Sequence, residues 1–309
     1  MLDALLQQFA RGDRMALSRL LTFVARGQYL EEIRSHLQRP SARSRVVAIT
    51  GSAGVGKSTL VGRLIDFLRG QQQTVAVLAC DPQSPLSGGA LLGDRFRMTT
   101  RPNDDGVFIR SLAAESGHSA VAPQLGPMTR VLEAFGFDVI LLETVGAGQG
   151  DTVIRDLADV LVLLLQPEAG DDIQWEKAGL LEIADIVVIH KADLPAADQV
   201  EAQVRAALEL SAGSSVPVLR ISSRTGKGVD ALWQAIVACT HRRDIEKLPG
   251  RELLQLTQDI LVSRFGHAEA AKDPHLAEII AQWQQGKQPG TIAAFSLVHL
   301  LEGYDRQDG

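Results

Sequence analysis

The chain has 309 residues, 45% of them hydrophobic and 22% charged, which is typical of a folded globular protein with a substantial core. Its formal net charge of −6 argues against a general binder of nucleic acid or of anionic membranes, because such proteins need clustered lysine and arginine side chains. Two cysteines, Cys80 and Cys239, are too few for a disulfide framework or a CxxC metal site, and they favour a reducing compartment such as the cytoplasm.

The first forty residues have apolar side chains at helical spacing. In "LSRLLTFV" apolar positions recur every three or four residues, and Gly12 and Gly27 interrupt the pattern, so two or three amphipathic helices are expected from Leu2 to Leu37. No basic start precedes a long apolar stretch here, and no apolar run in the chain reaches the roughly 18 residues that a membrane span requires. We therefore expect an N-terminal helical extension over residues 1–40 and no membrane partner.

Residues 41–243 alternate strand-like and helix-like segments. Most of the strand-like runs are continuously apolar, as in strands that are covered on both faces, so the pattern predicts an α/β fold with a mostly parallel sheet flanked by helices. The expected strands are Val46 to Thr50, Thr74 to Ala79, Val107 to Ile109, Val139 to Leu142, Val160 to Leu165, Ile186 to Ile189 and Val218 to Ile221.

Residues 244–309 have a helical pattern. Helices are expected from Glu252 to Phe265, from Leu276 to Gln284, and after Gly290. The last segment, "TIAAFSLVHLLEGY", is rich in apolar residues for a terminal helix, so it should be buried against its own domain or against a second subunit.

A phosphate-binding loop is predicted where the first strand ends. In "VVAITGSAGVGKSTL" the pattern Gly-x-x-x-x-Gly-Lys-Ser follows an apolar run and precedes a helical segment, a context that favours nucleotide binding over a plain turn. Backbone N–H groups of the loop and the positive end of the next helix would face the phosphates. The expected nucleotide contacts are Gly51, Ser52, Ala53, Gly54, Val55, Gly56, Lys57, Ser58 and Thr59, with Lys57 on the terminal phosphates and Ser58 on Mg²⁺. The loop alone leaves ATP and GTP open.

A carboxylate follows another apolar run. In "FDVILLETVGAGQGD", Glu143 stands three residues before Gly146, which is the spacing of the Asp-x-x-Gly motif of GTPases with the acid lengthened by one methylene. Glu143 would act on Mg²⁺, and the N–H of Gly146 would sense the γ-phosphate. The plainer alternative is a carboxylate that caps the next turn.

The polar segment from Cys80 to Met98 lies between these two elements and contains Asp81 and Asp94. Because loops of this length in compact domains are usually functional, we expect a switch loop whose acids approach the metal when nucleotide is bound. Solvated turn residues are the alternative.

A base-reading motif is predicted after the sixth strand. His190-Lys191-Ala192-Asp193 stands where GTPases have Asn-Lys-x-Asp, and the Asp193 carboxylate can accept hydrogen bonds from N1–H and the amino group of guanine, which adenine does not offer. Further on, Ser222 and Ser223 stand where the Ser-Ala loop of GTPases supports the base. Four elements in this order favour a guanine site in which His190 replaces an asparagine.

On these residues the chain resembles the MeaB-type GTPases (ArgK/MeaB P-loop GTPases), the G-protein chaperones of adenosylcobalamin-dependent acyl-CoA mutases. The likeness runs from about Gly12 to Trp233 and includes "DPQSPLSGGALLGDRFRM", "ETVGAGQ" and "LLLQPEAGDDIQWEKAGLLEIADIVVIHKADLP". The family has Asn where this chain has His190, so nucleotide affinity is in question more than nucleotide identity.

The resemblance implies Mg²⁺-dependent GTP hydrolysis, with GTP and GDP as ligands, coupled to loading a mutase with intact cofactor and protecting it. It implies catalytic roles for Lys57, Asp81, Asp94 and Glu143, and a metal site of Ser58, Asp81, Asp94 and Glu143. It also implies a third switch loop at Gln166 to Lys177, an adenosyltransferase as a further partner, and a homodimer held by a C-terminal arm over residues 244–309. The departures from the family suggest a mutase less common than methylmalonyl-CoA mutase.

Three other functions compete with this interpretation. A nickel-insertion GTPase usually carries histidine- or cysteine-rich metal ligands, whereas the seven histidines here are scattered. A small-molecule kinase would need a substrate pocket and a base near the γ-phosphate, and transfer of phosphate to arginine or a related amine would reveal it. A module that only changes conformation with GTP is disfavoured by the intact Lys57, Ser58 and Glu143.

Overall fold

A computed structural model gives the fold of two compact units, Met1–Arg243 and Asp244–Gly309. It describes residues 2–37, 43–82, 104–114, 124–144, 151–167, 178–210, 216–240, 243, 254, 257, 261, 264–266, 268–269 and 272–302. Of the predicted site residues, Asp94 and Gly146 lie outside this set. No helix in the described ranges is both long enough and apolar enough to cross a membrane.

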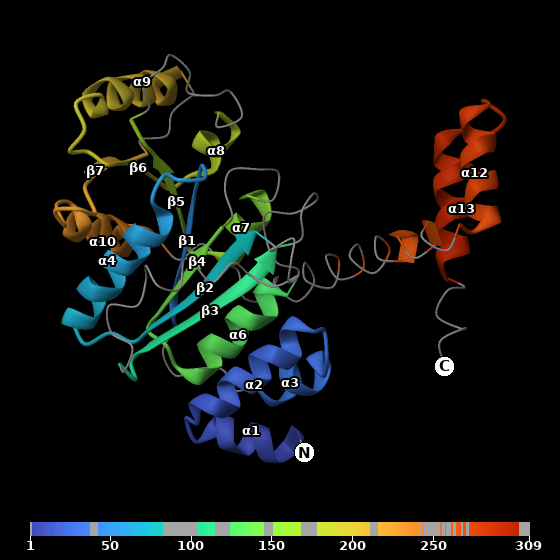
Figure 1. Ribbon diagram of the computed structural model, residues 1–309, viewed down its shortest axis with the longest axis horizontal. Coiled ribbons are helices and arrows are strands. Elements are labelled where there is room, and N and C mark those ends of the chain that lie inside the picture. Colours follow the sequence, from blue (N-terminus) through green and yellow to red (C-terminus); the bar gives the residue numbers. More distant parts are fainter. Residues whose placement is uncertain are drawn as a thin grey trace. The chain divides into compact units, whose positions relative to one another are not determined.

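The centre of the first unit is a seven-stranded sheet in the order β3-β2-β4-β1-β5-β6-β7, and each pairing between these strands is parallel (Figure 1). The strands are β1 Arg45–Gly51, β2 Val75–Pro82, β3 Val107–Ala114, β4 Val139–Glu143, β5 Val160–Leu165, β6 Ile186–His190 and β7 Val218–Ile221. All seven predicted strands are confirmed, with several ends extended by one or more residues. The α/β prediction is confirmed as well.

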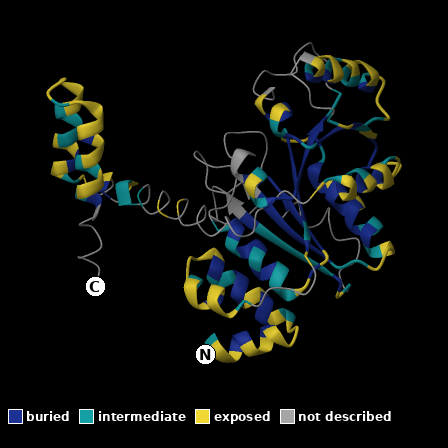
Figure 2. Ribbon diagram, turned by 180° about the vertical axis from the view of Figure 1, so that it is seen from behind, coloured by how far each residue is buried: buried dark blue, intermediate teal, exposed yellow. Residues whose placement is uncertain are grey.

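Helices cover both faces of this sheet because its central strands are apolar on both sides. On β1, Val46 and Ala48 pack into a cluster that also contains apolar residues of α2 and α6, whereas Val47 and Ile49 pack into a second cluster with α4 and α10. The helices that follow the strands are α4 Lys57–Gly70, α6 Leu125–Phe135, α7 Asp151–Leu157, α8 Ala178–Ile183, α9 Ala197–Leu210 and α10 Val229–Ala238. Figure 2 shows the buried strands at the centre and exposed residues on the outer faces of the helices.

Three N-terminal helices belong to the same core: α1 Leu2–Ala10, α2 Arg14–Ala25 and α3 Leu30–His36. Helix α2 starts after Asp13, whose side chain accepts a hydrogen bond from the N–H of Ala16 at 2.7 Å. Its fully buried side chains Leu17, Leu20 and Leu21 join the cluster that contains α6. The expected helical segment from Leu2 to Leu37 is thereby confirmed as three helices.

The second unit contains α12 Pro274–Gln284 and α13 Gly290–Glu302, which pack on each other around Leu276 and Leu301. Both expected helices are confirmed, while most of the helix expected from Glu252 to Phe265 lies outside the described residues. On α13, Ile292, Phe295 and Val298 are exposed within this chain. Their spacing of three residues places them along one side of the helix.

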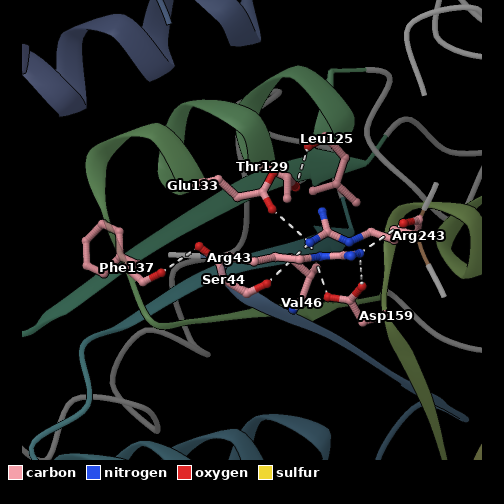
Figure 3. Close-up of polar contacts among 9 residues, drawn as sticks. All are labelled: Arg43, Ser44, Val46, Leu125, Thr129, Glu133, Phe137, Asp159 and Arg243. Carbon is pink, nitrogen blue, oxygen red and sulfur yellow. Dashed lines mark hydrogen bonds and ion pairs between the residues drawn. The ribbon is translucent and has the colours of Figure 1, made fainter. Parts of the chain in front are cut away.

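A buried charge network lies at the amino-terminal end of the sheet, beside the first residues of β1 and β5 (Figure 3). The guanidinium of Arg243 donates to Glu133 at 2.8 Å and to Asp159 at 3.2 Å, and Arg43 donates to the other Asp159 oxygen at 2.9 Å. Burial alone would raise the pKa of Asp159, but Arg243, the N–H of Val46 and Arg43 outweigh burial and hold that pKa below its ordinary value. The Arg243 side chain is therefore part of the buried core.

We expect Asp159→Asn to lower the free energy of unfolding by about 2 kcal/mol, because it leaves the buried Arg243 without its full counter-charge. Urea denaturation at neutral pH measures this change. Asp230→Asn, which alters an exposed carboxylate at the start of α10, should change stability by less than about 0.5 kcal/mol. Equal free energies of unfolding for the two variants would show that the charge network does not stabilise the fold.

Candidate nucleotide site

A cavity of about 730 Å³ lies at the carboxyl ends of the central strands, where ligands usually bind in open α/β sheets. Its walls come from the phosphate loop and the start of α4, the end of β4, and the loops after β6 and β7. Among the predicted site residues, those that line it are Ala53, Gly54, Gly56, Lys57, Ser58, Thr59, Glu143, His190, Lys191, Asp193 and Ser223. The structure thus brings together motifs that are more than 100 residues apart.

The phosphate loop needs glycine at two positions for steric reasons. A Cβ atom on Gly51 would lie 2.5 Å from the carbonyl oxygen of Leu164, and one on Gly56 would lie 2.5 Å from Cε1 of His190. Gly56 also has a φ of 101°, which a residue with a side chain rarely adopts. The loop can therefore run close against β5 and His190 and lead directly into the amino terminus of α4.

Lys57 is the first residue of α4, and its side chain folds back onto the phosphate loop. Its Nζ donates to the carbonyl oxygens of Gly51 at 2.9 Å and Ser52 at 3.1 Å, and only 7% of the residue is exposed. A cation held at a helix amino terminus, beside backbone N–H groups, makes a strongly anion-attracting environment. This arrangement suits the phosphates of a nucleotide.

Two oxygen-bearing side chains, Ser58 and Glu143, meet next to Lys57. The Ser58 hydroxyl donates to Glu143 Oε1 at 2.6 Å, and both residues are buried. Behind them, Thr144 donates to Thr50 at 3.0 Å and so joins the ends of β4 and β1. Hydroxyl and carboxylate oxygens are the donors that Mg²⁺ prefers, so this pair fits a magnesium ion.

The structure describes less of the other predicted acids. Asp81 lies in β2, two residues after Ala79, the residue that pairs with Glu143 of β4. Asp94 and Gly146 lie outside the described residues. Their roles at the metal and the γ-phosphate stay predictions.

The predicted base-reading residues come from the loops after β6 and β7. Ser222 donates to Asp193 Oδ1 at 2.7 Å, and Arg224 pairs with Oδ2 at 3.1 Å. The Ser222 hydrogen bond, with help from Arg224, lowers the pKa of Asp193, so the carboxylate is ionised and able to accept hydrogen bonds at neutral pH. Lys191 donates to the carbonyl of Gly54 at 3.1 Å and to the side chain of Gln166, and thereby links this loop to the phosphate loop.

His190 is buried between two of these segments. Its Nδ1 lies 2.6 Å from the carbonyl oxygen of Val55, and its Nε2 lies 2.7 Å from the hydroxyl of Ser223. Burial, together with the charge of Lys191, lowers the pKa of His190 below its ordinary value of 6.5, so the ring is neutral at neutral pH. Because a carbonyl can only accept, Nδ1 carries the proton and Nε2 accepts from Ser223.

The lowered pKa of His190 makes stability depend on pH. Below about pH 6.5 the unfolded chain binds a proton at His190 that the folded chain resists. As the pH is lowered, the free energy of unfolding should therefore decrease, by at most about 1.4 kcal/mol per pH unit. Urea unfolding of the wild type and of His190→Asn, between pH 7 and about pH 5, measures the effect as a difference in slope. Parallel curves for the two proteins would contradict it.

Sequence reasoning missed Arg63 and Arg224, which also line the cavity. Arg63 of α4 donates through Nε to the carbonyl oxygen of Ser223 at 2.6 Å and so holds the turn after β7. No local motif marks Arg63, since its partner is 160 residues away. The one sequence feature that could have indicated Arg224 is its position directly after Ser222 and Ser223.

Comparisons with known proteins show the family to which the chain is similar. A family model described as "Methylmalonyl Co-A mutase-associated GTPase MeaB" matches residues 17–258. A Pyrococcus abyssi protein with the name "Putative GTPase" is 41% identical over 254 residues, which cover 80% of this chain and 78% of that protein. The fused isobutyryl-CoA mutase of Cupriavidus metallidurans is 36% identical over 252 residues, or 77% of this chain and 23% of that much longer protein.

Among solved structures, the LAO/AO transport system kinase superposes with a TM-score of 0.65 over 97% of each chain. At 21% identity this similarity shows a shared fold alone. Together with the loop after β1, it confirms the predicted P-loop NTPase architecture.

Proposed function

The chain belongs to the family of methylmalonyl-CoA mutase-associated GTPases, and on that premise we propose that it is a magnesium-dependent chaperone of an adenosylcobalamin-dependent acyl-CoA mutase. As a member of this family it is a GTP-hydrolysing enzyme. The observation that carries the proposed chemistry is the 2.6 Å contact between Ser58 and Glu143 beside the buried Lys57. These three residues surround the place where the β- and γ-phosphates of GTP would bind.

Each residue has a definite task in this proposal. Lys57 binds the terminal phosphate oxygens, while the N–H groups at the start of α4 orient the β-phosphate. Ser58 and Glu143 would hold the magnesium ion, with Asp81 and Asp94 as further proposed acids at the metal, and Mg²⁺ would neutralise charge that develops on the phosphate oxygens. Gly146 is proposed to sense the γ-phosphate through its N–H. Intrinsic turnover should be slow, because no glutamine that could position water directly follows Gly146.

Guanine would be selected by residues of the loops after β6 and β7. The ionised Asp193 accepts hydrogen bonds from N1–H and the amino group of the base, and Ser222 holds one of its oxygens in place. The backbone of Ser223 and the stem of Lys191 border the base. Adenine lacks this pair of donors, so ATP should bind far more weakly than GTP.

The proposed client is a mutase because relatives of this chain are associated with, or fused to, such enzymes by name. Residues 166–177 follow β5 and are the proposed third switch loop toward that client, and an adenosyltransferase is a proposed further partner. The exposed Ile292, Phe295 and Val298 support the proposal that residues 244–309 form a homodimerisation arm. The low cysteine count, with Cys80 and Cys239 as the two in the chain, supports a cytoplasmic, reducing location.

The decisive experiment is Mg²⁺-dependent hydrolysis of GTP, with ATP as the control nucleotide, by the protein alone and with purified adenosylcobalamin-dependent mutases. We expect slow GTP turnover that one mutase accelerates, and no turnover of ATP. Stimulation by isobutyryl-CoA mutase or another related mutase should exceed that by methylmalonyl-CoA mutase if the client is a less common one. GTP turnover that no mutase alters would refute the chaperone proposal while leaving the GTPase activity intact.

A further inference from the structure

We propose that His190 is a positioning residue that joins the phosphate loop to the base-reading turn, and that Ser223 is its matched partner. His190 ends β6, Val55 lies in the phosphate loop, and Ser223 lies in the turn after β7. This inference rests on the guanine-nucleotide part of the proposed function, since a positioning role is measured through a bound nucleotide.

Both ring nitrogens of His190 are used within the protein. Nδ1 donates to the Val55 carbonyl at 2.6 Å, and Nε2 accepts from the Ser223 hydroxyl at 2.7 Å. A neutral imidazole has no further polar atom with which to read a base. His190 therefore acts through Val55 and Ser223 rather than by hydrogen bonding to guanine.

The imidazole also packs directly on the phosphate loop. A Cβ on Gly56 would lie 2.5 Å from Cε1 and 2.7 Å from Nδ1 of His190, so the ring edge rests against the backbone that caps α4. With only 3% of His190 exposed, the ring has little room to move independently of this backbone. A shift of the ring would move the phosphate-binding N–H groups with it.

The turn at Ser223 is held from three sides. Its hydroxyl bonds to His190, its carbonyl oxygen accepts from Arg63 of α4, and its neighbour Ser222 donates to Asp193. The hydroxyl contact thus fixes the separation between the carboxylate that reads the base and the loop that binds the phosphates. That separation must match the length of a nucleotide so that its base and its phosphates can bind at the same time. Fixing the separation in advance preorganises the site.

Two small substitutions remove the same contact from its opposite ends. Asparagine at position 190 places its amide nitrogen as many bonds from the backbone as Nδ1 of histidine, so His190→Asn can keep the hydrogen bond to Val55 but cannot reach Ser223. Ser223→Ala removes the hydroxyl and leaves the Val55 bond in place. Because both changes delete one shared interaction, their effects on nucleotide affinity should not add.

The test is a double-mutant cycle read by titration calorimetry with GDP. Each single variant should raise the Kd for GDP about 3- to 10-fold. The Kd of the double variant should be no higher than that of the single variant with the larger Kd. His190→Ala, which removes both contacts, should weaken GDP binding more than either. The KM for GTP should rise in parallel, whereas kcat at saturating GTP should change by less than about twofold, because the phosphate-binding Lys57, Ser58 and Glu143 are unaltered.

Ser44→Ala is the matched control, since Ser44 is a buried serine whose hydroxyl donates at 2.6 Å to Phe137 at the amino-terminal end of the sheet. It should lower the melting temperature without changing the Kd for GDP. Additive effects of His190→Asn and Ser223→Ala, or wild-type affinity in both, would overturn the inference. A wild-type protein that binds no GDP would instead refute the guanine site itself, so the two failures are distinguishable.

Discussion

Asp193→Asn should weaken GDP binding by about 10³-fold or more, and it should bind xanthosine diphosphate better than the wild type does. The structure holds the Asp193 carboxylate in the cavity with one oxygen fixed by Ser222 and its pKa lowered, so it presents acceptors only. Asparagine keeps the oxygen that accepts from Ser222, but it has an NH₂ group, a hydrogen-bond donor, in place of the second carboxylate oxygen. That donor opposes the amino group of guanine and suits the carbonyl that xanthine has at the same position.

Titration calorimetry measures the affinity of each protein for GDP and for xanthosine diphosphate, and so tests both the expected loss and the expected gain. Asp198→Asn is the control, because its carboxylate is on the surface of α9, where it pairs with Arg220, and its loss should leave both affinities unchanged. If Asp193→Asn binds GDP within tenfold of the wild type, the loop after β6 is not the base reader. The guanine specificity would then have to come from backbone groups near Ser223.

Lys57→Ala should lower kcat for GTP hydrolysis by about 10²- to 10³-fold, which is the usual effect of removing one preorganised group that stabilises transition-state charge. The Nζ of Lys57 is held by the carbonyls of Gly51 and Ser52, so its position is set before the phosphates arrive. Alanine removes the charge but preserves the backbone N–H groups of the loop. Residual binding of GDP is therefore expected, while turnover is nearly lost.

Single-turnover hydrolysis at saturating GTP and Mg²⁺ separates this effect from weaker binding. Lys287→Ala removes an exposed lysine of the second unit and should hydrolyse GTP at the wild-type rate. Melting temperatures of both variants show whether the fold is retained. Turnover by Lys57→Ala within threefold of the wild type would place the γ-phosphate away from the loop after β1.

Local patterns in the sequence predict much of the fold. Mostly apolar runs, such as Val160 to Leu165, predicted the seven strands, because a strand that is buried on both faces carries few polar side chains. The motifs at Gly51 to Ser58 and at Glu143 were found for a similar reason. A phosphate loop needs glycine and lysine at fixed spacing, so its chemistry is visible without a partner.

Contacts between distant segments were decided only by the tertiary structure. The sequence identified His190 as a substitution, but its hydrogen bonds reach residues 135 and 33 positions away, so no local pattern could reveal them. The burial of Arg243 depends likewise on Glu133 and Asp159, which are 110 and 84 positions distant. By itself the sequence determined which elements form and which chemistry they carry, because periodicity and spacing act over a few residues. Packing decided which side chains meet, because a hydrogen bond or ion pair forms only after the sheet and its helices have brought its two ends within about 3 Å.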